Sequence, residues 1–352
     1  MRFIPVCLLA SVALATADEV RLNQIQTIGS HNSYHVAPPA ELLKTIVKFN
    51  KDAEAWNYTH PSLAAQLDMG VRQFELDVFA DSKGGLFSKP SILQLTKLSG
   101  AKDTSVDPAG ELTKPGFKVL HVPEIDCWSN TPTLKGGLGE MLAWSDQHPR
   151  HLPLMILLEC KDQPQPPLPT KPEPLTRERL LDLEKEILSV IPTDRILKPD
   201  DVRGKLATLR EGIEKNGWPL LDTLRGKFLF CLDNTDAIRD RYLEGNPALE
   251  GRLIFVSAPD AKHPAAGWFK CNDPIREQEK IRELVKAGFL VRTRTDTSKP
   301  DAEMKRNAFG SGAQWVSTDH FRVEDPERVE FEGGSIVRGN PVSGAPAAKI
   351  EP

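Results

Sequence analysis

Histidine and amide side chains follow the first of several apolar, β-type runs in this sequence. Residues 22–28 read LNQIQTI, and His31 and Asn32 come just after them, with His35 four residues beyond His31. Two imidazoles so placed could bind a metal ion, exchange protons, or comprise one functional group and one bystander. Two prolines soon follow His35 and favour a loop there. We therefore predict that His31 is functional and that His35 is a bystander, with contact to substrate at the rim as the alternative.

Carboxylates occupy comparable positions in two later runs. Glu75 and Asp77 are two residues apart in VRQFELDVF, so they share one face of a strand. Glu159 closes the run LPLMILLE, where a carboxylate is costly unless it is paired or binds a metal. Asn32, Glu75, Asp77 and Glu159 are all oxygen ligands, which suit Ca²⁺ or Mg²⁺. We expect Ca²⁺, because it tolerates irregular geometry and is abundant outside cells.

A third run, FKVLH, ends in His121. His31 and His121 would then stand beside the ion from two different strands, as a pair for acid–base chemistry on a phosphodiester. The metal would lower the pKa of a substrate oxygen and stabilise the charged transition state. Each group alone is typical of ordinary turns or solvated faces, and it is their recurrence at successive strand ends that indicates a site. Lys161, Lys227, Arg292 and Arg294 are basic residues in or just after these runs.

These side chains require a fold that brings strand ends together. Eight β-type runs alternate with helical patterns at 40–56, 61–69, 136–148, 176–190, 275–287 and 300–309. The runs are 22–28, 71–79, 117–121, 152–159, 227–232, 252–257, 289–294 and 313–318. This alternation predicts a single-domain α/β protein, a distorted (β/α)₈ TIM barrel, with a doubly wound open sheet as the alternative. Active sites of such barrels lie at the carboxyl ends of the strands.

The ends of the chain suggest export. Residues 1–17 combine an early arginine, an apolar run and an Ala-Thr-Ala cleavage site, which indicates a signal peptide. We assign 18–326 to the catalytic barrel and expect the Gly/Pro/Ala-rich segment 327–352 to be disordered. The protein would be secreted, or periplasmic in a bacterium, without a transmembrane anchor, and monomeric.

Composition narrows the partners. The formal charge of −4 gives no basic excess for nucleic acid. Beyond the signal, the cysteines are Cys127, Cys160, Cys231 and Cys271, and their even number leaves disulfides and buried free thiols equally open.

The ordered motifs resemble a known family. QIQTIGSHNSYH, GVRQFELDVF, KVLHVPEID, LMILLECKD, RGKFLF, VRTRTDT and GAQWVSTD, spread over 22–319, are similar to the exported, Ca²⁺-dependent phosphoinositide phospholipase C-like proteins of microbes. The resemblance implies that His31 contacts the phosphoryl oxygen, that His121 protonates the diacylglycerol leaving oxygen, and that Asn32, Glu75, Asp77 and Glu159 hold Ca²⁺. It further implies that a base such as Glu75 deprotonates the inositol 2-hydroxyl, giving inositol 1,2-cyclic phosphate and diacylglycerol.

Several points depart from the family or leave alternatives open. The resemblance implies that basic residues bind the phosphates of the lipid headgroup, and the candidates here are Lys161, Lys227, Arg292 and Arg294. These four residues match no clean family motif. That difference favours phosphatidylinositol or a related anchor over its polyphosphorylated forms. The loop 80–116, with Leu86, Phe87, Ile92 and Leu93, either dips into a phospholipid surface or packs as an ordinary loop. Rival functions are a glycerophosphodiester phosphodiesterase, whose usual opening is HR rather than HN, a sphingomyelinase D-like enzyme, and a non-catalytic barrel that binds Ca²⁺ and headgroups.

Overall fold

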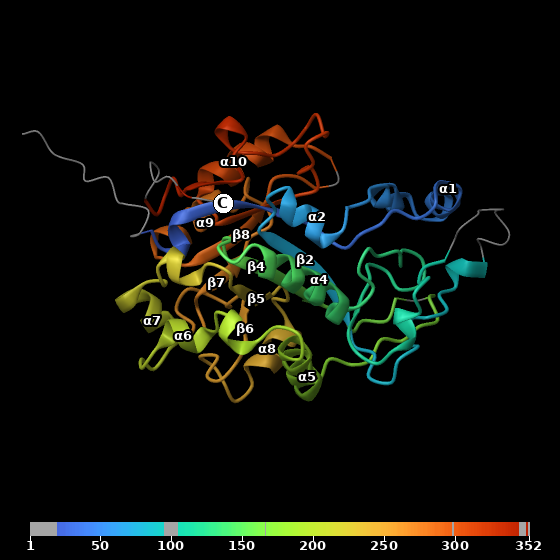
Figure 1. Ribbon diagram of the computed structural model, residues 1–352, viewed down its shortest axis with the longest axis horizontal. Helices are drawn as coiled ribbons and strands as arrows, with labels where there is room; N and C mark the ends of the chain where they lie inside the picture. Colours follow the sequence, from blue (N-terminus) through green and yellow to red (C-terminus); the bar gives the residue numbers. More distant parts are fainter. Residues whose placement is uncertain (1–19, 95–104, 166, 298, 345–349, 351–352) are drawn as a thin grey trace, which may run out of the picture.

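Eight parallel strands form a nearly closed barrel in the computed structural model, which describes residues 20–94, 105–165, 167–297, 299–344 and 350. The barrel strands follow the order β6-β5-β4-β2-β1-β9-β8-β7. A single bridge from Ser257 to Trp268 joins the two end strands. The predicted TIM barrel is confirmed (Figure 1). The strands are β1 (Ile25–Ser30), β2 (Gln73–Phe79), β4 (Leu154–Cys160), β5 (Phe228–Leu232), β6 (Ile254–Val256), β7 (Trp268–Lys270), β8 (Leu290–Arg294) and β9 (Trp315–Thr318).

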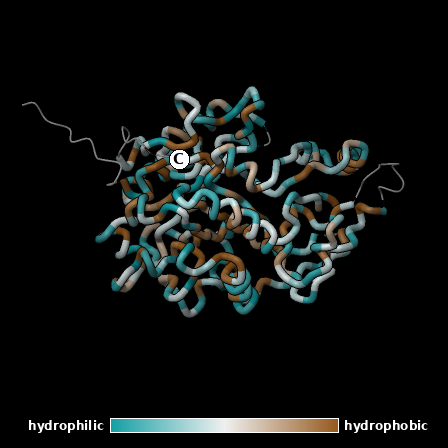
Figure 2. The backbone as a smooth tube through the Cα atoms, in the orientation of Figure 1, coloured by the Kyte–Doolittle hydropathy of each residue, from teal (hydrophilic) through white to brown (hydrophobic). Residues whose placement is uncertain are grey.

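The barrel strands are buried on both faces, as strands covered by helices must be. Every residue of β2 and β5 is buried, and Figure 2 shows apolar stretches within the body of the barrel and hydrophilic stretches over many outer turns. The helices are α1 (Ala40–Phe49), α2 (Leu63–Asp68), α4 (Leu134–Gln147), α5 (Arg177–Leu188), α6 (Pro199–Arg203), α7 (Leu209–Asn216), α8 (Ala237–Leu243), α9 (Gln278–Lys286) and α10 (Ala302–Ser311). Among the described residues, no helix is long and apolar enough to cross a membrane.

One predicted barrel strand belongs elsewhere. The run 117–121 contains β3 (Lys118–Val119), which pairs antiparallel with the end of β2 and lies outside the barrel order. The eighth barrel strand is instead β7, which lies next to β8 and was not predicted from the sequence. Three residues are too few to show a periodic pattern.

The segment after residue 327 is packed as far as residue 344, contrary to the expected disorder. Its strand β10 (Val337–Gly339) pairs antiparallel with β1. Val329, Phe331 and Val337 are buried in the main core. Three apolar side chains within a Gly-rich sequence are enough to anchor it. The folded part thus passes the predicted boundary at 326, while the predicted signal peptide lies outside the described residues.

A second, smaller core extends the barrel beside the carboxyl end of β2. It unites α1, the 3₁₀ helix Lys51–Trp56 and the long loop after β2, on the right of Figure 1. Phe87 and Ile92 of that loop are buried in this core. The described parts of the loop, 80–94 and 105–116, thus pack here through Phe87 and Ile92, which are not available to a lipid surface, whereas Leu86 is 37% exposed.

Candidate active site

Three carboxylates meet at the carboxyl ends of β2 and β4. The register pairs Asp77 with Glu159 directly, and Glu75 lies two residues earlier on the same face of β2. One oxygen from each of Glu75, Asp77 and Glu159 lies within 4.8 Å of the other two. Oδ1 of Asp77 is buried without a hydrogen-bond partner among the described residues. A buried, unsatisfied oxygen in an all-oxygen cluster fits a calcium ion.

Two cations partly neutralise this cluster. Lys161 contacts Asp77 and lies 3.5 Å from Glu159. Arg292, fully buried, contacts Glu75 and donates to Ser317 Oγ over 2.9 Å. Lys161 and Arg292, predicted to bind the headgroup, therefore hold carboxylates in this structure.

The carboxylates differ in their pKa values. Burial raises the pKa of Glu159 to about 8, and the neighbouring Asp77 charge adds to the rise against the opposing effect of Lys161. Burial would also raise the pKa of Asp77, but the charges of Lys161 and His121 outweigh it and leave that pKa below its usual value. The cluster thus carries less than its full charge near neutral pH, and a bound cation would restore it.

Asn32 lies next to this cluster in a strained backbone conformation. Its φ is +42°, in the left-handed region that asparagine tolerates better than most residues. The adjacent Ser33 is fixed to β2, because its N–H donates to Glu75 O over 3.0 Å and its Oγ accepts from Glu75 N over 2.9 Å. Asn32 is thereby held beside β2, and its assignment as a metal ligand stays a prediction.

His31 is fixed by partners from the neighbouring strands β9 and β8. Its main-chain N–H donates to Thr318 O of β9, and its Nδ1 donates to Asp319 over 3.1 Å. Arg294 donates to the other ring nitrogen, Nε2, over 3.2 Å. Burial would raise the pKa of Asp319, but His31, with help from His60 and Arg294, holds it well below its usual range. His31 and Arg294 thus come together, as two groups able to bind a phosphoryl oxygen.

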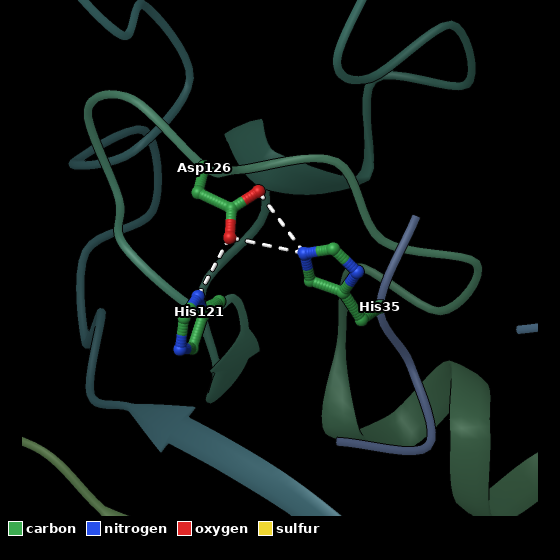
Figure 3. Close-up of side chains that lie close together, drawn as sticks. All are labelled: His35, His121 and Asp126. Carbon is green, nitrogen blue, oxygen red and sulfur yellow. Dashed lines mark hydrogen bonds and ion pairs between the residues drawn. The ribbon is translucent and has the colours of Figure 1, made fainter. Parts of the chain in front are cut away.

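His121 is oriented by a short local turn. Main-chain hydrogen bonds between Val122 and Asp126 fold the chain back, so that Nδ1 of His121 donates to Asp126 over 2.6 Å. The other ring nitrogen of His121 points away from Asp126 (Figure 3). That nitrogen is free to carry a proton to a bound substrate.

His35 holds the same carboxylate from the other side. Its Nε2 lies 3.0 and 3.1 Å from the two oxygens of Asp126, and its Nδ1 lies 2.9 Å from Tyr58 O (Figure 3). The ring is fully buried and stacks on Tyr58 at 4.2 Å. The prediction of a loop bystander is wrong, because His35 supports the aspartate that orients His121.

The remaining predicted site residue lies at the other end of the barrel. Lys227 directly precedes β5, at its amino end, and donates to Asp194 O over 2.6 Å. The structure does not bring it to the carboxylates or to either histidine. Its place as the first residue of the run KFLFCL already put it at the amino end of that strand.

Several residues of the site escaped sequence reasoning. Asp126 and Asp319 orient the two histidines, and both follow a strand motif that was recognised. Asp233 follows β5 and contacts Lys270 of β7, the strand that was missed. The side chains around Lys270 and Asn272 line a cavity of about 810 Å³, and Asn272 accepts from Arg292 over 2.6 Å.

The four described cysteines are buried free thiols. Burial raises the pKa of each of these thiols. Of the two possibilities left open by the sequence, the structure thus shows free thiols.

Comparisons with known proteins agree with this geometry. The sequence model of the family "Phosphoinositide phospholipase C, Ca2+-dependent" matches residues 20–341, so the chain belongs to that family. No curated protein sequence matches the chain. A calcium-dependent phosphoinositol-specific phospholipase C from Pseudomonas sp. is similar in structure, with a TM-score of 0.57 and 14% identity over 92% of this chain and 96% of that one. The calcium-dependent phosphatidylinositol-specific enzyme of Streptomyces antibioticus gives 0.53 and 18% over 87% and 96%.

The protein is thus a phosphoinositide phospholipase C-like phosphodiesterase, and its cofactor is Ca²⁺. The clustered carboxylate oxygens of Glu75, Asp77 and Glu159 fit that ion.

Proposed function

We propose that the protein cleaves phosphatidylinositol-type lipids into diacylglycerol and inositol 1,2-cyclic phosphate. The observation that carries the proposal is the presence of two His–Asp pairs, His31–Asp319 and His121–Asp126, around one carboxylate cluster. One imidazole is needed at the phosphoryl group and one at the leaving oxygen.

His31 and Arg294 are suited to the phosphoryl group. Asp319 fixes the His31 ring through Nδ1, and Arg294 lies at Nε2. A phosphoryl oxygen would accept a hydrogen bond from Arg294, and one from His31 Nε2 when that nitrogen carries a proton and is released from Arg294, which stabilises the negative charge that grows in the transition state.

Proton transfer falls to Glu75 and His121. Glu75 takes the proton of the inositol 2-hydroxyl, whose oxygen attacks phosphorus. The bond from phosphorus to the glycerol oxygen breaks, and that oxygen receives the proton of the outward ring nitrogen of His121. When bound by Asn32, Glu75, Asp77 and Glu159, calcium lowers the pKa of the attacking hydroxyl and offsets phosphoryl charge. Arg292 keeps Glu75 in place.

We assign the headgroup to the cavity beside Lys270, because Asn272 in its lining accepts a hydrogen bond from Arg292, which holds Glu75. The charged lining of this cavity is balanced, with three cations and three anions: Arg239, Lys270, Lys280, Asp260, Glu277 and Glu283. A pocket for several ring phosphates would need an excess of cations. This balance supports phosphatidylinositol over its polyphosphorylated forms. We further propose that the protein is exported through its signal sequence and acts as a monomer at a phospholipid surface.

The test is hydrolysis of phosphatidylinositol vesicles by the purified protein, with calcium and then with a chelator, followed by ³¹P NMR. We expect a cyclic inositol phosphate signal that disappears with the chelator and in His121→Ala. Turnover of glycerophosphoinositol in place of the lipid would contradict the proposal and favour a glycerophosphodiesterase. No turnover of either, with calcium still bound, would indicate a binding barrel.

A further inference from the structure

A further cavity lies at the end of the barrel opposite the catalytic residues. It measures about 410 Å³. Arg72 directly precedes β2, while His151 and Arg225 come just before β4 and β5. These three strands are neighbours in the order β5-β4-β2, so the three side chains meet at their amino ends. Along β2, Arg72 precedes Glu75 and Asp77 of the carboxylate cluster by three and five residues, or roughly 10 to 17 Å.

The cavity lining is strongly basic. It contains Arg72, Arg150 and Arg225, together with His148 and His151, and no acidic side chain. Asp222 lies outside the lining and pairs with Arg225 at 2.7 Å and only loosely with Arg150 at 4.0 Å. The end of α4 adds a negative dipole charge of about half a unit, which three guanidinium groups outweigh.

Arg72 is the least compensated of these cations. The residue is only 6% exposed, and its guanidinium lies 5.3 Å from the centre of the Trp144 ring. Its Nη1 donates to two main-chain carbonyl oxygens, but its Nε has no hydrogen-bond partner in the described part of the chain. Arg72 forms no ion pair with a described carboxylate, since none lies within 4.0 Å of its guanidinium. Burial lowers the pKa of Arg72 to about 10, and the charge of Asp68 acts in the opposite direction. Asp68 instead accepts from Trp144 Nε1 over 2.7 Å.

The rest of the lining forms rigid walls. Trp144 stacks on His148 at 4.1 Å with an interplanar angle of 16°. His151 is held at both ring nitrogens, by Ser145 Oγ and Leu152 O. A small anion would therefore meet guanidinium groups beside a rigid aromatic wall, which limits the entropic cost of binding.

We propose that this cavity is a binding site for a phosphate-bearing anion, separate from the catalytic centre. A phosphate group offers several oxygens to more than one guanidinium, which suits a pocket with three arginines better than a single carboxylate would. Because the cavity and the catalytic residues lie at opposite ends of the barrel, a phosphate bound here does not contact the lipid being cleaved.

The test is titration calorimetry with inorganic phosphate in calcium-free buffer, at constant ionic strength set with sodium chloride. We expect one phosphate to bind here and its Kd to rise by about tenfold or more in Arg150→Gln and Arg225→Gln, as loss of a charged hydrogen bond predicts. Arg276→Gln is the matched control, since Arg276 is 88% exposed and also pairs with one aspartate. Arg294→Gln should retain this binding, which separates it from phosphate at the catalytic centre.

Loss of binding in Arg294→Gln but not in Arg150→Gln would overturn the proposal, as would a titration no different from one with chloride alone. The Arg150 side chain is 69% exposed, so its replacement leaves the fold intact even if Arg225→Gln does not. Sedimentation with phosphatidylcholine vesicles, with and without phosphatidic acid, identifies the source. Retention on phosphatidic acid that is lost in Arg150→Gln indicates a lipid headgroup, and phosphate binding without retention indicates a free anion.

Discussion

Nδ1 of His121 donates to the carboxylate of Asp126 over 2.6 Å, and His35 holds the same carboxylate from its other side. The proposed acid is therefore oriented by a group that is itself fixed. Asp126→Asn should lower kcat by about 10²- to 10⁴-fold with little change in KM, because the ring of His121 loses its anionic partner. His35→Gln should cost less, about tenfold, through looser support of Asp126. Steady-state kinetics check both, and an unchanged kcat in Asp126→Asn would contradict the role given to the pair.

The role of His121 as an acid can be isolated with the leaving group. His121→Ala should lose most activity toward phosphatidylinositol but much less toward an inositol phosphodiester with a nitrophenol leaving group, which departs without a proton. The fold should be unchanged by circular dichroism. Equal losses toward the two substrates would show that His121 does something other than donate a proton.

Calcium affinity should depend on pH through Glu159. Its pKa of about 8 without metal means that the group is protonated near neutral pH and must release that proton to bind the ion. Calcium should therefore bind more tightly as the pH rises from 6.5 to 8.5. Calorimetry in two buffers of different ionisation enthalpy measures the released proton, which should disappear in Glu159→Gln along with much of the affinity. Proton release that persists in that variant would assign the proton to another group.

The stability of the barrel should fall on mild acidification through His151. Burial lowers the pKa of His151 to about 4. The hydrogen bond to Leu152 O acts to raise this pKa, and the nearby charges of Arg72, Arg195 and His148 act to lower it further. Because the unfolded chain binds the proton more tightly, stability is retained above the unfolded value of 6.5 and is lost as the pH falls toward 4. The difference of 2.5 pH units, from 6.5 − 4, corresponds to at most about 3 kcal/mol. Urea unfolding at pH 7 and pH 5 measures the change in the free energy of unfolding. This change should be smaller in the His151→Gln variant. An equal pH dependence in that variant would contradict this account.

The sequence predicted the barrel and the meeting of Glu75, Asp77 and Glu159, because both rest on local patterns. Apolar runs that carry these carboxylates near their carboxyl ends mark strands and their polar positions together. The supporting residues were harder to predict. Asp319 reaches His31 across 288 positions, and no local pattern records such a contact.

Charge alone also misled the prediction. Lys161 and Arg292 looked like headgroup ligands, yet they neutralise carboxylates that other strands bring to them. The type of a side chain shows which interactions it can make, but the residue that it contacts depends on how the barrel packs. His35 shows the same limit, since its contact with Asp126 depends on a turn in a distant segment.

The pairing of β10 with β1 has a consequence for how the protein is made. Thr27 of β1, four residues before His31, pairs with Trp315 of β9 and with Val337 of β10. The first strand therefore cannot complete its pairing until residues 315 and 337 have been synthesised. Pairing between segments so far apart in sequence is slow to form. We therefore expect His31 to reach its position beside Arg294 only after most of the barrel strands have been synthesised.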